Sequence, residues 1–263
     1  MNLHLSSKTA FISGSTQGIG FAIAKKLLGE GARVIINGRL ESKVNTAVEK
    51  LQAAIPGAVV SGIAADFGSA DQINQLISQL PEIDILINNV GIFELKDFED
   101  ITDPDWFRFF EINVMSGVRL SRALLPGMIQ RNQGRIVFIS SESGIKIPAN
   151  MIHYGMTKTS MISIARGLSE LTKNTDVTVN SIIGGPTYSD GVSAVIEEIA
   201  LSANEDVTQF KNNLFKSLNP SSLLQRFITP EEIANLAVYL ASPLSIATNG
   251  AALRADGGML AQL

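Results

Sequence analysis

Short apolar runs rich in β-branched residues alternate with longer helical patterns along this 263-residue chain. Each run is bounded by glycine or polar turn residues, as expected for a buried strand. Strands separated by helices pair in parallel through crossover connections. We therefore predict an α/β, three-layer, doubly wound (Rossmann) fold, with a parallel seven-stranded sheet and helices on both faces. The predicted strands are 9–13, 34–36, 59–64, 83–87, 135–141, 177–183 and 251–254.

The intervening segments carry helical periodicity. Residues 189–225 break the rhythm with two helix-like pieces, at 192–201 and 207–218. Because we find no linker, repeat or low-complexity stretch, we predict one domain over residues 1–263, with a helical substrate lid at about 189–225. The other helices are predicted after the glycines at 14–20, at 43–54 and 70–80, from Trp106 through Asn113 towards Met128, from Tyr154 onwards, and after the N-cap Thr229 with Pro230 at the first helical position.

Composition limits the function classes. The chain is 45% hydrophobic and 17% charged, which fits a globular protein with a substantial core. A net charge of -4 offers no basic footprint for nucleic acid. With neither a signal-peptide core nor a membrane-length apolar run, we expect a cytoplasmic protein that does not bind membranes. The chain has no cysteine and two histidines, His4 and His153, so we predict no metal site.

Glycines 14, 18 and 20 lie where the first predicted strand turns into a helix. Glycine allows positive φ and close approach of the backbone to a pyrophosphate, while the helix N-terminus supplies free N–H groups. The alternative is a tight strand–helix turn without a ligand. Its position in a βαβ pattern favours a dinucleotide-binding loop formed by Gly14, Ser15, Thr16, Gly18, Ile19 and Gly20.

The end of the second predicted strand reads Asn37-Gly38-Arg39. An acidic residue there would bind the ribose 2′-hydroxyl of NAD, and none is present. The Arg39 guanidinium could pair with a 2′-phosphate, although it could also be a solvated loop residue. We therefore expect NADP(H) to be favoured over NAD(H).

Tyr154 and Lys158 are four residues apart on a predicted helix and so share one face. An adjacent ammonium favours a phenolate and should lower the pKa of the tyrosine from its usual value of about 10. With a hydroxyl from the neighbouring strand end, at Ser141, the pair could form a proton-transfer site. A Tyr-x-x-x-Lys pair alone also fits an ordinary helix face, so its support comes from the glycine loop upstream.

Taken together, these motifs resemble the short-chain dehydrogenase/reductase family over nearly the whole chain. Ser13-Gly14 with Gly18-Ile19-Gly20 resembles the family's Thr-Gly-x-x-x-Gly-Ile-Gly loop. The segment 88–91, Asn-Asn-Val-Gly, resembles its Asn-Asn-Ala-Gly turn, and Asp66 resembles its adenine-contacting aspartate. The family's catalytic tetrad falls on Asn113, Ser141, Tyr154 and Lys158.

The resemblance implies an enzyme that transfers a hydride between NADP(H) and a carbonyl/secondary alcohol pair. Tyr154 would be the general acid/base, and Ser141 would hold the substrate oxygen. Lys158 would bind the nicotinamide ribose and favour the Tyr154 phenolate, while Asn113 would position a water linking Lys158 to solvent. The cofactor contacts implied outside the glycine loop are Arg39, Asp66, Phe67, Asn89, Gly91, Tyr154, Lys158, Gly185, Thr187 and Ser189.

The sequence departs from the family pattern at Val90, in place of a small alanine, and at 184–186, Gly-Gly-Pro in place of Pro-Gly. Ser189 replaces a threonine and keeps the hydroxyl. These changes affect substrate placement more than cofactor binding. The candidate substrate contacts are Ser143, Ile145, His153 and Tyr188, with a structural role for His153 favoured over proton transfer.

Apolar residues of the lid, such as Val195 and Ile199, indicate either a hydrophobic substrate or a face packed on the protein body. The helices at 103–128 and 154–172 resemble those that the family buries between subunits, which implies a homotetramer or homodimer. A cofactor-binding regulator or scaffold with little activity is the competing hypothesis, and the intact tetrad argues against it. The identity of the small-molecule substrate and the direction of the reaction stay open.

Overall fold

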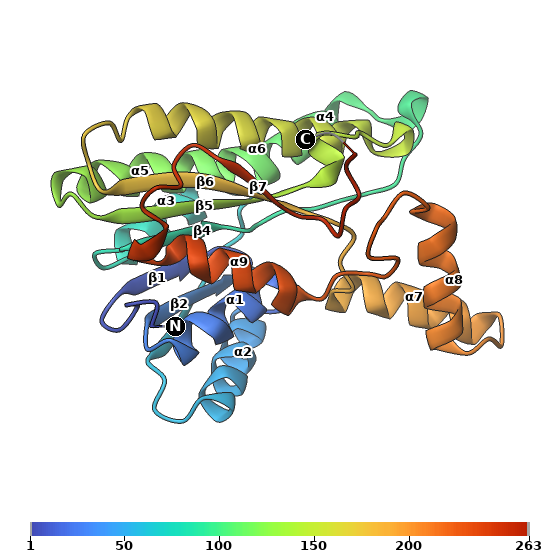
Figure 1. Ribbon diagram of the computed structural model, residues 1–263, viewed down its shortest axis with the longest axis horizontal. Coiled ribbons are helices and arrows are strands. Elements are labelled where there is room, and N and C mark those ends of the chain that lie inside the picture. Colours follow the sequence, from blue (N-terminus) through green and yellow to red (C-terminus); the bar gives the residue numbers. More distant parts are fainter. Residues whose placement is uncertain (1, 262–263) are drawn as a thin grey trace.

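A parallel sheet of seven strands forms the centre of the protein, in the order β3-β2-β1-β4-β5-β6-β7 (Figure 1). The computed structural model describes residues 2–261, so the outermost residues of the predicted domain, 1 and 262–263, lie outside it. The doubly wound fold predicted from the alternating pattern is confirmed. The strands are β1 (Thr9–Ile12), β2 (Arg33–Gly38), β3 (Val60–Ala64), β4 (Ile85–Asn88), β5 (Gly134–Ser141), β6 (Val177–Gly184) and β7 (Ala252–Ala255).

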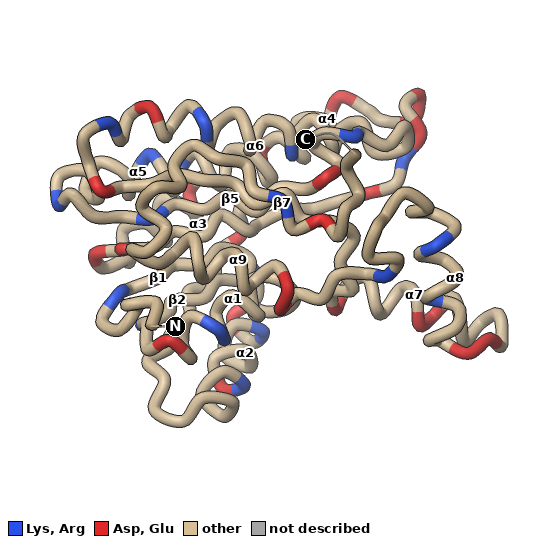
Figure 2. The backbone as a smooth tube through the Cα atoms, in the orientation of Figure 1, with Lys and Arg blue, Asp and Glu red and all other residues tan. Residues whose placement is uncertain are grey.

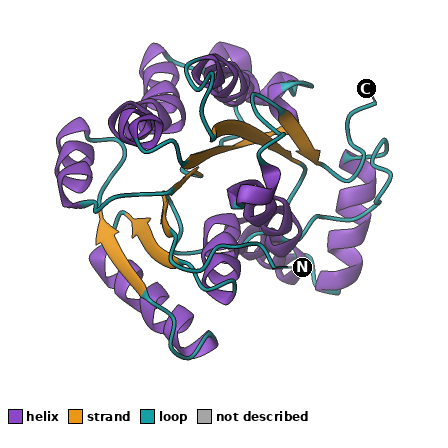
Figure 3. Ribbon diagram, turned by 60° about the vertical axis from the view of Figure 1, so that its left-hand side comes forward, coloured by secondary structure: helices purple, strands orange, loops and turns teal. Residues whose placement is uncertain are grey.

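Helices cover both faces of the sheet, as Figure 3 shows. One apolar core lies between the sheet and α1, α2 and α9, and the other lies between the sheet and α3, α5 and α6. All eight residues of β5 and of β6 are buried, as expected for central strands of a parallel sheet covered on both faces. The helices are α1 (Gly18–Gly29), α2 (Glu41–Ala54), α3 (Ala70–Gln79), α4 (Asp103–Phe110), α5 (Ser116–Gln130), α6 (Ile152–Glu170), α7 (Asp190–Ser202), α8 (Val207–Leu218) and α9 (Pro230–Ala241).

The start of α9, predicted at Thr229 and Pro230, shows how local sequence determines where a helix begins. The Thr229 side chain accepts a hydrogen bond from the Glu232 backbone N–H, and the Glu232 carboxylate accepts one from the Thr229 N–H at 2.8 Å. Pro230 occupies the first helical position, where no backbone donor is needed. This capping box fixes where the chain enters α9.

Positions of Lys and Arg are interspersed with those of Asp and Glu along the backbone (Figure 2). Within residues 2–261, no helix has the length and apolar character needed to cross a bilayer. Over the same residues, His, Asp and Glu side chains do not gather in threes as a metal site would require.

The direction of winding reverses between β1 and β4, which are neighbours in the sheet. In doubly wound sheets, ligands bind in the crevice at the carboxyl ends of the strands where the order reverses. Here Gly14 follows the end of β1, and Asn89 follows the end of β4. The α7 and α8 segment follows the carboxyl end of β6 and projects from the body beside this crevice (Figure 1).

The predicted aromatic helix is interrupted. A π-helical turn, Glu111–Met115, joins α4 to α5 and contains Asn113. Such turns insert an extra residue in the helix and re-aim the side chains that follow, often at functional sites. Hydrophobic periodicity cannot reveal it, because the residues on either side keep their helical pattern.

Gly117 lets α5 approach the sheet closely. A Cβ added to Gly117 would lie 2.7 Å from Cε1 of Phe138 on β5 and 3.4 Å from the side-chain carbon of Asn88 on β4. The absence of a side chain here therefore sets the distance between α5, which follows the Asn113 turn, and the strands that carry the site.

We predict opposite stability effects for two glycine-to-alanine changes in helices. Gly117→Ala should lower the free energy of unfolding by about 1–3 kcal/mol, because the methyl group must displace Phe138. Gly167→Ala on α6, where an added Cβ meets nothing within 4 Å, should raise it by about 0.5–1 kcal/mol through helix propensity. Urea unfolding measures both, and a Gly117→Ala protein as stable as Gly167→Ala would contradict the close packing.

Candidate active site

The loop between β1 and α1 requires its glycines. Gly14 and Gly18 have φ of +62° and +61°, in the left-handed region. A Cβ added to Gly20 would lie 2.6 Å from Asn89 Nδ2 and 2.6 Å from the Gly14 carbonyl oxygen. The loop is thus folded tightly against the end of β4, with its backbone, rather than side chains, lining the start of α1.

Asn37, on β2, and Ser15 hold the loop between β1 and α1 in place through hydrogen bonds. The Gly14 N–H donates to Asn37 Oδ1 at 3.1 Å, and Asn37 Nδ2 donates to the Ile63 carbonyl at 3.0 Å. The Ser15 hydroxyl donates to the Ile12 carbonyl at 2.7 Å and accepts the Asn37 N–H at 2.9 Å. The Ser15 side chain is therefore buried, and its predicted contact with a cofactor is wrong for the hydroxyl. Asn37 was noted in the sequence only for lacking a carboxylate, and its structural role was missed.

Asn89 ties the loop to β4. Its Nδ2 donates to the carbonyls of Ser13 at 3.1 Å and Gly14 at 2.7 Å, while its backbone N–H donates to Ser13 Oγ at 3.0 Å. Both amide protons are therefore used within the protein. Asn89 therefore determines the shape of the loop.

The N-terminus of α1 already accepts an anionic group. The Gly18 N–H donates to the Asp190 carboxylate, at the start of α7, over 2.6 Å. The first hydrogen bond of the helix comes later, from the Phe21 N–H to the Gln17 carbonyl at 3.4 Å, so the N–H groups of 18–20 precede it. This end of α1 therefore fits the pyrophosphate of a dinucleotide, and Asp190 shows that an oxyanion can sit there.

A cavity of about 360 Å³ opens between the glycine loop and α2. Thr16 lines it, together with the ammonium-bearing side chains Lys43 and Lys50. Arg39 is exposed at the end of β2. The two lysines were not selected from the sequence, although they lie four and eleven residues beyond Arg39 on the helix that follows.

Asp66 and Phe67, which follow β3, lie in different environments. Asp66 is partly buried, and its Oδ1 accepts the Gly68 N–H at 2.9 Å, which leaves its second oxygen for another partner. Phe67 is 3% exposed and packs in the core beneath the sheet. Because its aromatic ring is part of the core, the predicted contact of Phe67 with a cofactor would have to come from its main chain.

Ser141, Tyr154 and Lys158 come together at the carboxyl end of β5. Ser141 is the last residue of β5, and Tyr154 lies in the first turn of α6. Lys158 Nζ lies 5.6 Å from the centre of the Tyr154 ring and donates to the Ile139 carbonyl at 3.0 Å. The predicted grouping of a phenol, an ammonium and a strand-end hydroxyl is present.

Burial governs the proton affinities of this group. It raises the pKa of Tyr154 well above its usual value; the Glu142 carboxylate adds to the rise, and Ser141 opposes it. Burial lowers the pKa of Lys158 to about 8, opposed by Glu142. The lowered Tyr154 pKa expected from Lys158 is therefore wrong, because desolvation and the nearby Glu142 carboxylate raise this pKa instead.

Glu142 was missed by the sequence analysis. It opens a short 3₁₀ turn, Glu142–Gly144, directly after β5. Its Oε2 accepts the Ser141 hydroxyl at 2.7 Å, and its Oε1 accepts the Ser143 hydroxyl at 3.2 Å. The only signal available was an acidic residue next to Ser141, and chain adjacency gives no direction for a side chain.

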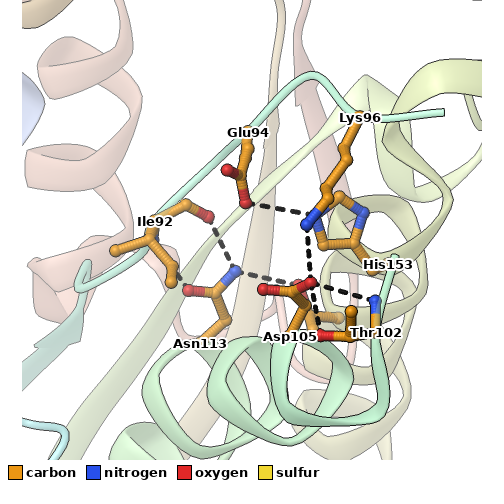
Figure 4. Close-up of polar contacts among 8 residues, drawn as sticks. Ile92, Glu94, Lys96, Thr102, Asp105, Asn113 and His153 are labelled. Atoms are coloured by element: carbon orange, nitrogen blue, oxygen red, sulfur yellow. Dashed lines mark hydrogen bonds and ion pairs between the residues drawn. The ribbon is translucent and has the colours of Figure 1, made fainter. Parts of the chain in front are cut away.

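The Asn113 side chain locks the loop after β4 onto α6 (Figure 4). Its Oδ1 accepts the Ile92 N–H at 2.7 Å, and its Nδ2 donates to the Ile92 carbonyl at 2.9 Å and to Thr157 Oγ1 at 3.0 Å. Gly91 consequently lies beside Lys158, where an added Cβ would be 3.3 Å from Nζ. Both amide protons are used, so the water role implied by the resemblance would fall to the Asn113 main-chain carbonyl.

The His153 side chain lies in the interior, beside Glu94 on the loop after β4 (Figure 4). It is 0% exposed, its ring centroid is 4.1 Å from that of Phe109, and Nε2 is 4.0 Å from a Glu94 carboxylate oxygen. Burial lowers its pKa. A substrate cannot reach this ring without rearrangement, so His153 is wrong as a substrate contact and packs as a structural side chain.

The other candidate substrate contacts differ in access. Ile145 is 46% exposed and open to a ligand. Ser143 is buried, with its hydroxyl on Glu142. The Tyr188 hydroxyl donates to Glu197 at 3.2 Å, and its ring lies 4.7 Å from Lys211 Nζ, which attaches it to α7 and α8.

The segment after β6 leads into α7. Gly185 is closely packed, since an added Cβ would lie 2.7 Å from the Asp256 carbonyl oxygen. The Thr187 hydroxyl donates to the Gly185 carbonyl at 2.9 Å, and Ser189 precedes α7 at its N-cap. Within α7, Ile196 is buried against the protein body, as one of the two alternatives predicted. Val195 and Ile199 are exposed, which leaves them open to a hydrophobic substrate, the other alternative.

We predict a pH-dependent stability cost at Lys158. Its proton is bound more weakly in the folded protein, so wild-type stability should rise with pH between about 8 and 10.5. Lys158→Met should therefore unfold in urea with about 1–2 kcal/mol more stability than wild type at pH 7, and this advantage should shrink at pH 10. The exposed Lys25→Met serves as control, and a pH-independent difference for Lys158→Met would contradict the assignment.

Comparisons with known proteins agree with this geometry. The family model described as short chain dehydrogenase matches residues 8–200. The uncharacterized oxidoreductase YvaG of Bacillus subtilis is 48% identical, over 99% of this chain and 98% of that protein. D-beta-hydroxybutyrate dehydrogenase of Cupriavidus necator is 33% identical, over 98% of this chain and 100% of that protein.

Among solved structures, L-sorbose reductase of Gluconobacter frateurii, complexed with NADPH and L-sorbose, superposes with a TM-score of 0.93. It is 28% identical, with all of both chains covered. The matched family model spans both the glycine loop and the group formed by Ser141, Tyr154 and Lys158. The chain therefore belongs to the short-chain dehydrogenase/reductase family of oxidoreductases.

Proposed function

We propose that this protein interconverts a carbonyl compound and the corresponding secondary alcohol, using NADP(H) in preference to NAD(H), with Tyr154 as general acid/base. The observation that carries the proposal is the convergence of Ser141, Tyr154 and Lys158 at the carboxyl end of β5. Gly91, after β4, lies beside Lys158 and links this group to the crevice that begins at the glycine loop.

Tyr154 is suited to give a proton to a substrate oxygen. Its raised pKa keeps the phenol protonated at neutral pH, which is the form needed when a carbonyl is reduced. The bound nicotinamide would supply the hydride to the carbonyl carbon. Ser141 would bind the same oxygen through its hydroxyl, and oxidation of the alcohol would return the proton to Tyr154.

Lys158 would bind the nicotinamide ribose hydroxyls and restore the proton to Tyr154. With a pKa of about 8 it can give up a proton close to neutral pH, which an ordinary lysine does not. The main-chain carbonyl of Asn113 would hold the water that connects Lys158 to solvent. The nucleotide would lie along the backbone of 14–20, with Asp66 at the adenine and Thr187 and Ser189 at the nicotinamide carboxamide.

The cofactor preference rests on charge. No carboxylate follows β2 at 37–39, where Arg39 is exposed, and Lys43 and Lys50 line the cavity beside the glycine loop. Cationic side chains attract a 2′-phosphate and a carboxylate would repel it. The structural neighbour with NADPH bound supports the same preference.

The substrate class is open at this level, because the named relatives include enzymes for L-sorbose, a polyhydroxy ketone, and for a hydroxybutyrate, a carboxylate. We propose that residues 189–225 act as a lid over it. We also propose that the protein acts in the cytoplasm. We propose that it forms a homotetramer or homodimer, since Phe107 of α4 is 74% exposed and an apolar side chain of this size favours burial against a second subunit.

Tyr154→Phe should reduce turnover at least 10³-fold while changing NADPH affinity less than threefold, because it removes one oxygen. Nicotinamide absorbance against a carbonyl panel measures turnover, and fluorescence titration measures cofactor binding. Near-normal turnover in the variant would refute the acid/base assignment. NADPH binding without turnover in the wild type would favour the alternative of a cofactor-binding regulator.

Arg39→Ala should raise the KM for NADPH about 10- to 100-fold and leave that for NADH within about twofold, because loss of one charge-assisted contact to phosphate costs about 1.5–3 kcal/mol. The variant Arg33→Ala, exposed at the opposite end of β2, is the matched control. A wild type that prefers NADH would discard the NADP(H) preference and leave the oxidoreductase intact.

A further inference from the structure

The carboxylate of Glu142 accepts the hydrogen bond that the Ser141 hydroxyl would have to donate to the substrate oxygen in the proposed reaction. Its Oε2 accepts the Ser141 hydroxyl at 2.7 Å, and its Oε1 accepts the Ser143 hydroxyl at 3.2 Å. Glu142 is partly buried, and the ion pairs found within residues 2–261 do not include it. A carboxylate held by two hydroxyls thus lies directly beside the group that would bind the substrate oxygen.

A serine hydroxyl has a single proton. While Ser141 donates it to Glu142, its oxygen can accept hydrogen bonds but cannot donate to a carbonyl oxygen. The Ser143 N–H already donates to Ser141 Oγ at 3.1 Å, so the hydroxyl is fixed from two sides. Ser141 can therefore hold a substrate carbonyl only if Glu142 receives another donor in its place.

The substrate itself can supply that donor. A carbonyl oxygen seated between Ser141 and Tyr154 places the neighbouring substrate carbon next to the Glu142 carboxylate, because that carboxylate is in direct contact with Ser141. A hydroxyl on that carbon would donate to Glu142 and allow the Ser141 proton to turn to the carbonyl oxygen. Every hydrogen bond of the carboxylate would be preserved.

We propose that Glu142 is a specificity residue that selects carbonyl substrates bearing a hydroxyl on the adjacent carbon (α-hydroxy ketones) and rejects those bearing a carboxylate there. The proposal rests on the proposed function, since it assumes carbonyl reduction with Ser141 and Tyr154 at the oxygen. A methyl group in the same place gives Glu142 no donor, and a carboxylate brings two negative charges into contact.

The charges around Glu142 agree with this selection. Tyr154 and Lys158, both from α6, are the titratable groups on which its charge acts, and it raises the pKa of each. Burial raises the pKa of Glu142 itself, while the hydrogen bonds from Ser141 and Ser143 oppose the rise. Lys158 is thus the one nearby cation among these groups, and a substrate carboxylate would add an anion with no second cation to balance it.

The test compares ketones that differ in one substituent, with NADPH as cofactor. Hydroxyacetone, butanone and acetoacetate carry a hydroxyl, a methyl and a carboxylate on the same carbon next to the carbonyl. The same series with phenyl in place of the ketone's methyl group repeats the comparison. For wild type, kcat/KM should be about 10- to 100-fold higher for the hydroxy ketone than for the alkyl ketone, and lowest for the keto acid.

In Glu142→Gln the ranking should collapse. The hydroxy ketone should lose at least tenfold relative to the alkyl ketone, and the keto acid should gain, because the amide is neutral and nearly the same size. Glu170→Gln, exposed at the end of α6, should keep the wild-type ranking. NADPH titration of each variant reports whether the cofactor site is intact, and the wild-type ranking tests the proposal even if Glu142→Gln does not fold.

The outcomes separate this proposal from the function on which it rests. Turnover that is lost in Tyr154→Phe but shows equal kcat/KM for alkyl and hydroxy ketones, or a preference for the keto acid, would overturn the role of Glu142 and leave the reductase standing. A Glu142→Gln protein that binds NADPH and keeps the wild-type ranking would overturn it also. A wild type inert towards the whole series would overturn both.

Discussion

The hydrogen bonds that fasten the glycine loop to the ends of β2 and β4 are the constraint on which the rest of the site depends. Asn37 holds the Gly14 N–H from one side, and Asn89 holds the Gly14 carbonyl from the other. Both atoms of the Asn37 amide and the amide nitrogen of Asn89 are used within the protein, so the loop backbone is fixed before any ligand arrives. The start of α1 is thereby held at the crevice, where the Gly18 N–H already binds the Asp190 carboxylate and an anion can be bound.

A second set of contacts brings Tyr154 and Lys158 to the same crevice. Asn113, on its π-helical turn, is bonded both to Ile92 after β4 and to Thr157 on α6. This joins three elements that are distant in the sequence and places Gly91 against Lys158. The nucleotide end and the reactive end of the crevice are therefore coupled through one amide side chain.

Burial of Tyr154 and Lys158 has an electrostatic cost, because their charged forms are removed from water. Burial lowers the pKa of Lys158 and raises that of Tyr154, and both shifts mean that the charged forms are disfavoured where they lie. Glu142 modifies both values and competes for the Ser141 proton. Such a site has poised proton affinities because its polar groups are removed from water, and the surrounding core of β5 and α6 supplies the stability that offsets this cost.

The fold and the principal site motifs followed from the sequence because they depend on local or periodic signals. Alternating apolar runs and helical patterns determine a parallel, doubly wound sheet, and glycines with positive φ are required wherever a strand turns tightly into an anion-binding helix. Tertiary structure alone decided the rest. Whether Ser15 and Phe67 face a ligand or the core, whether His153 is accessible, and where the Glu142 carboxylate points all depend on which elements pack over each side chain. The pKa of Tyr154 shows the same limit: its neighbour Lys158 can be read from helical spacing, but the desolvation that raises the Tyr154 pKa arises only when the whole crevice is assembled.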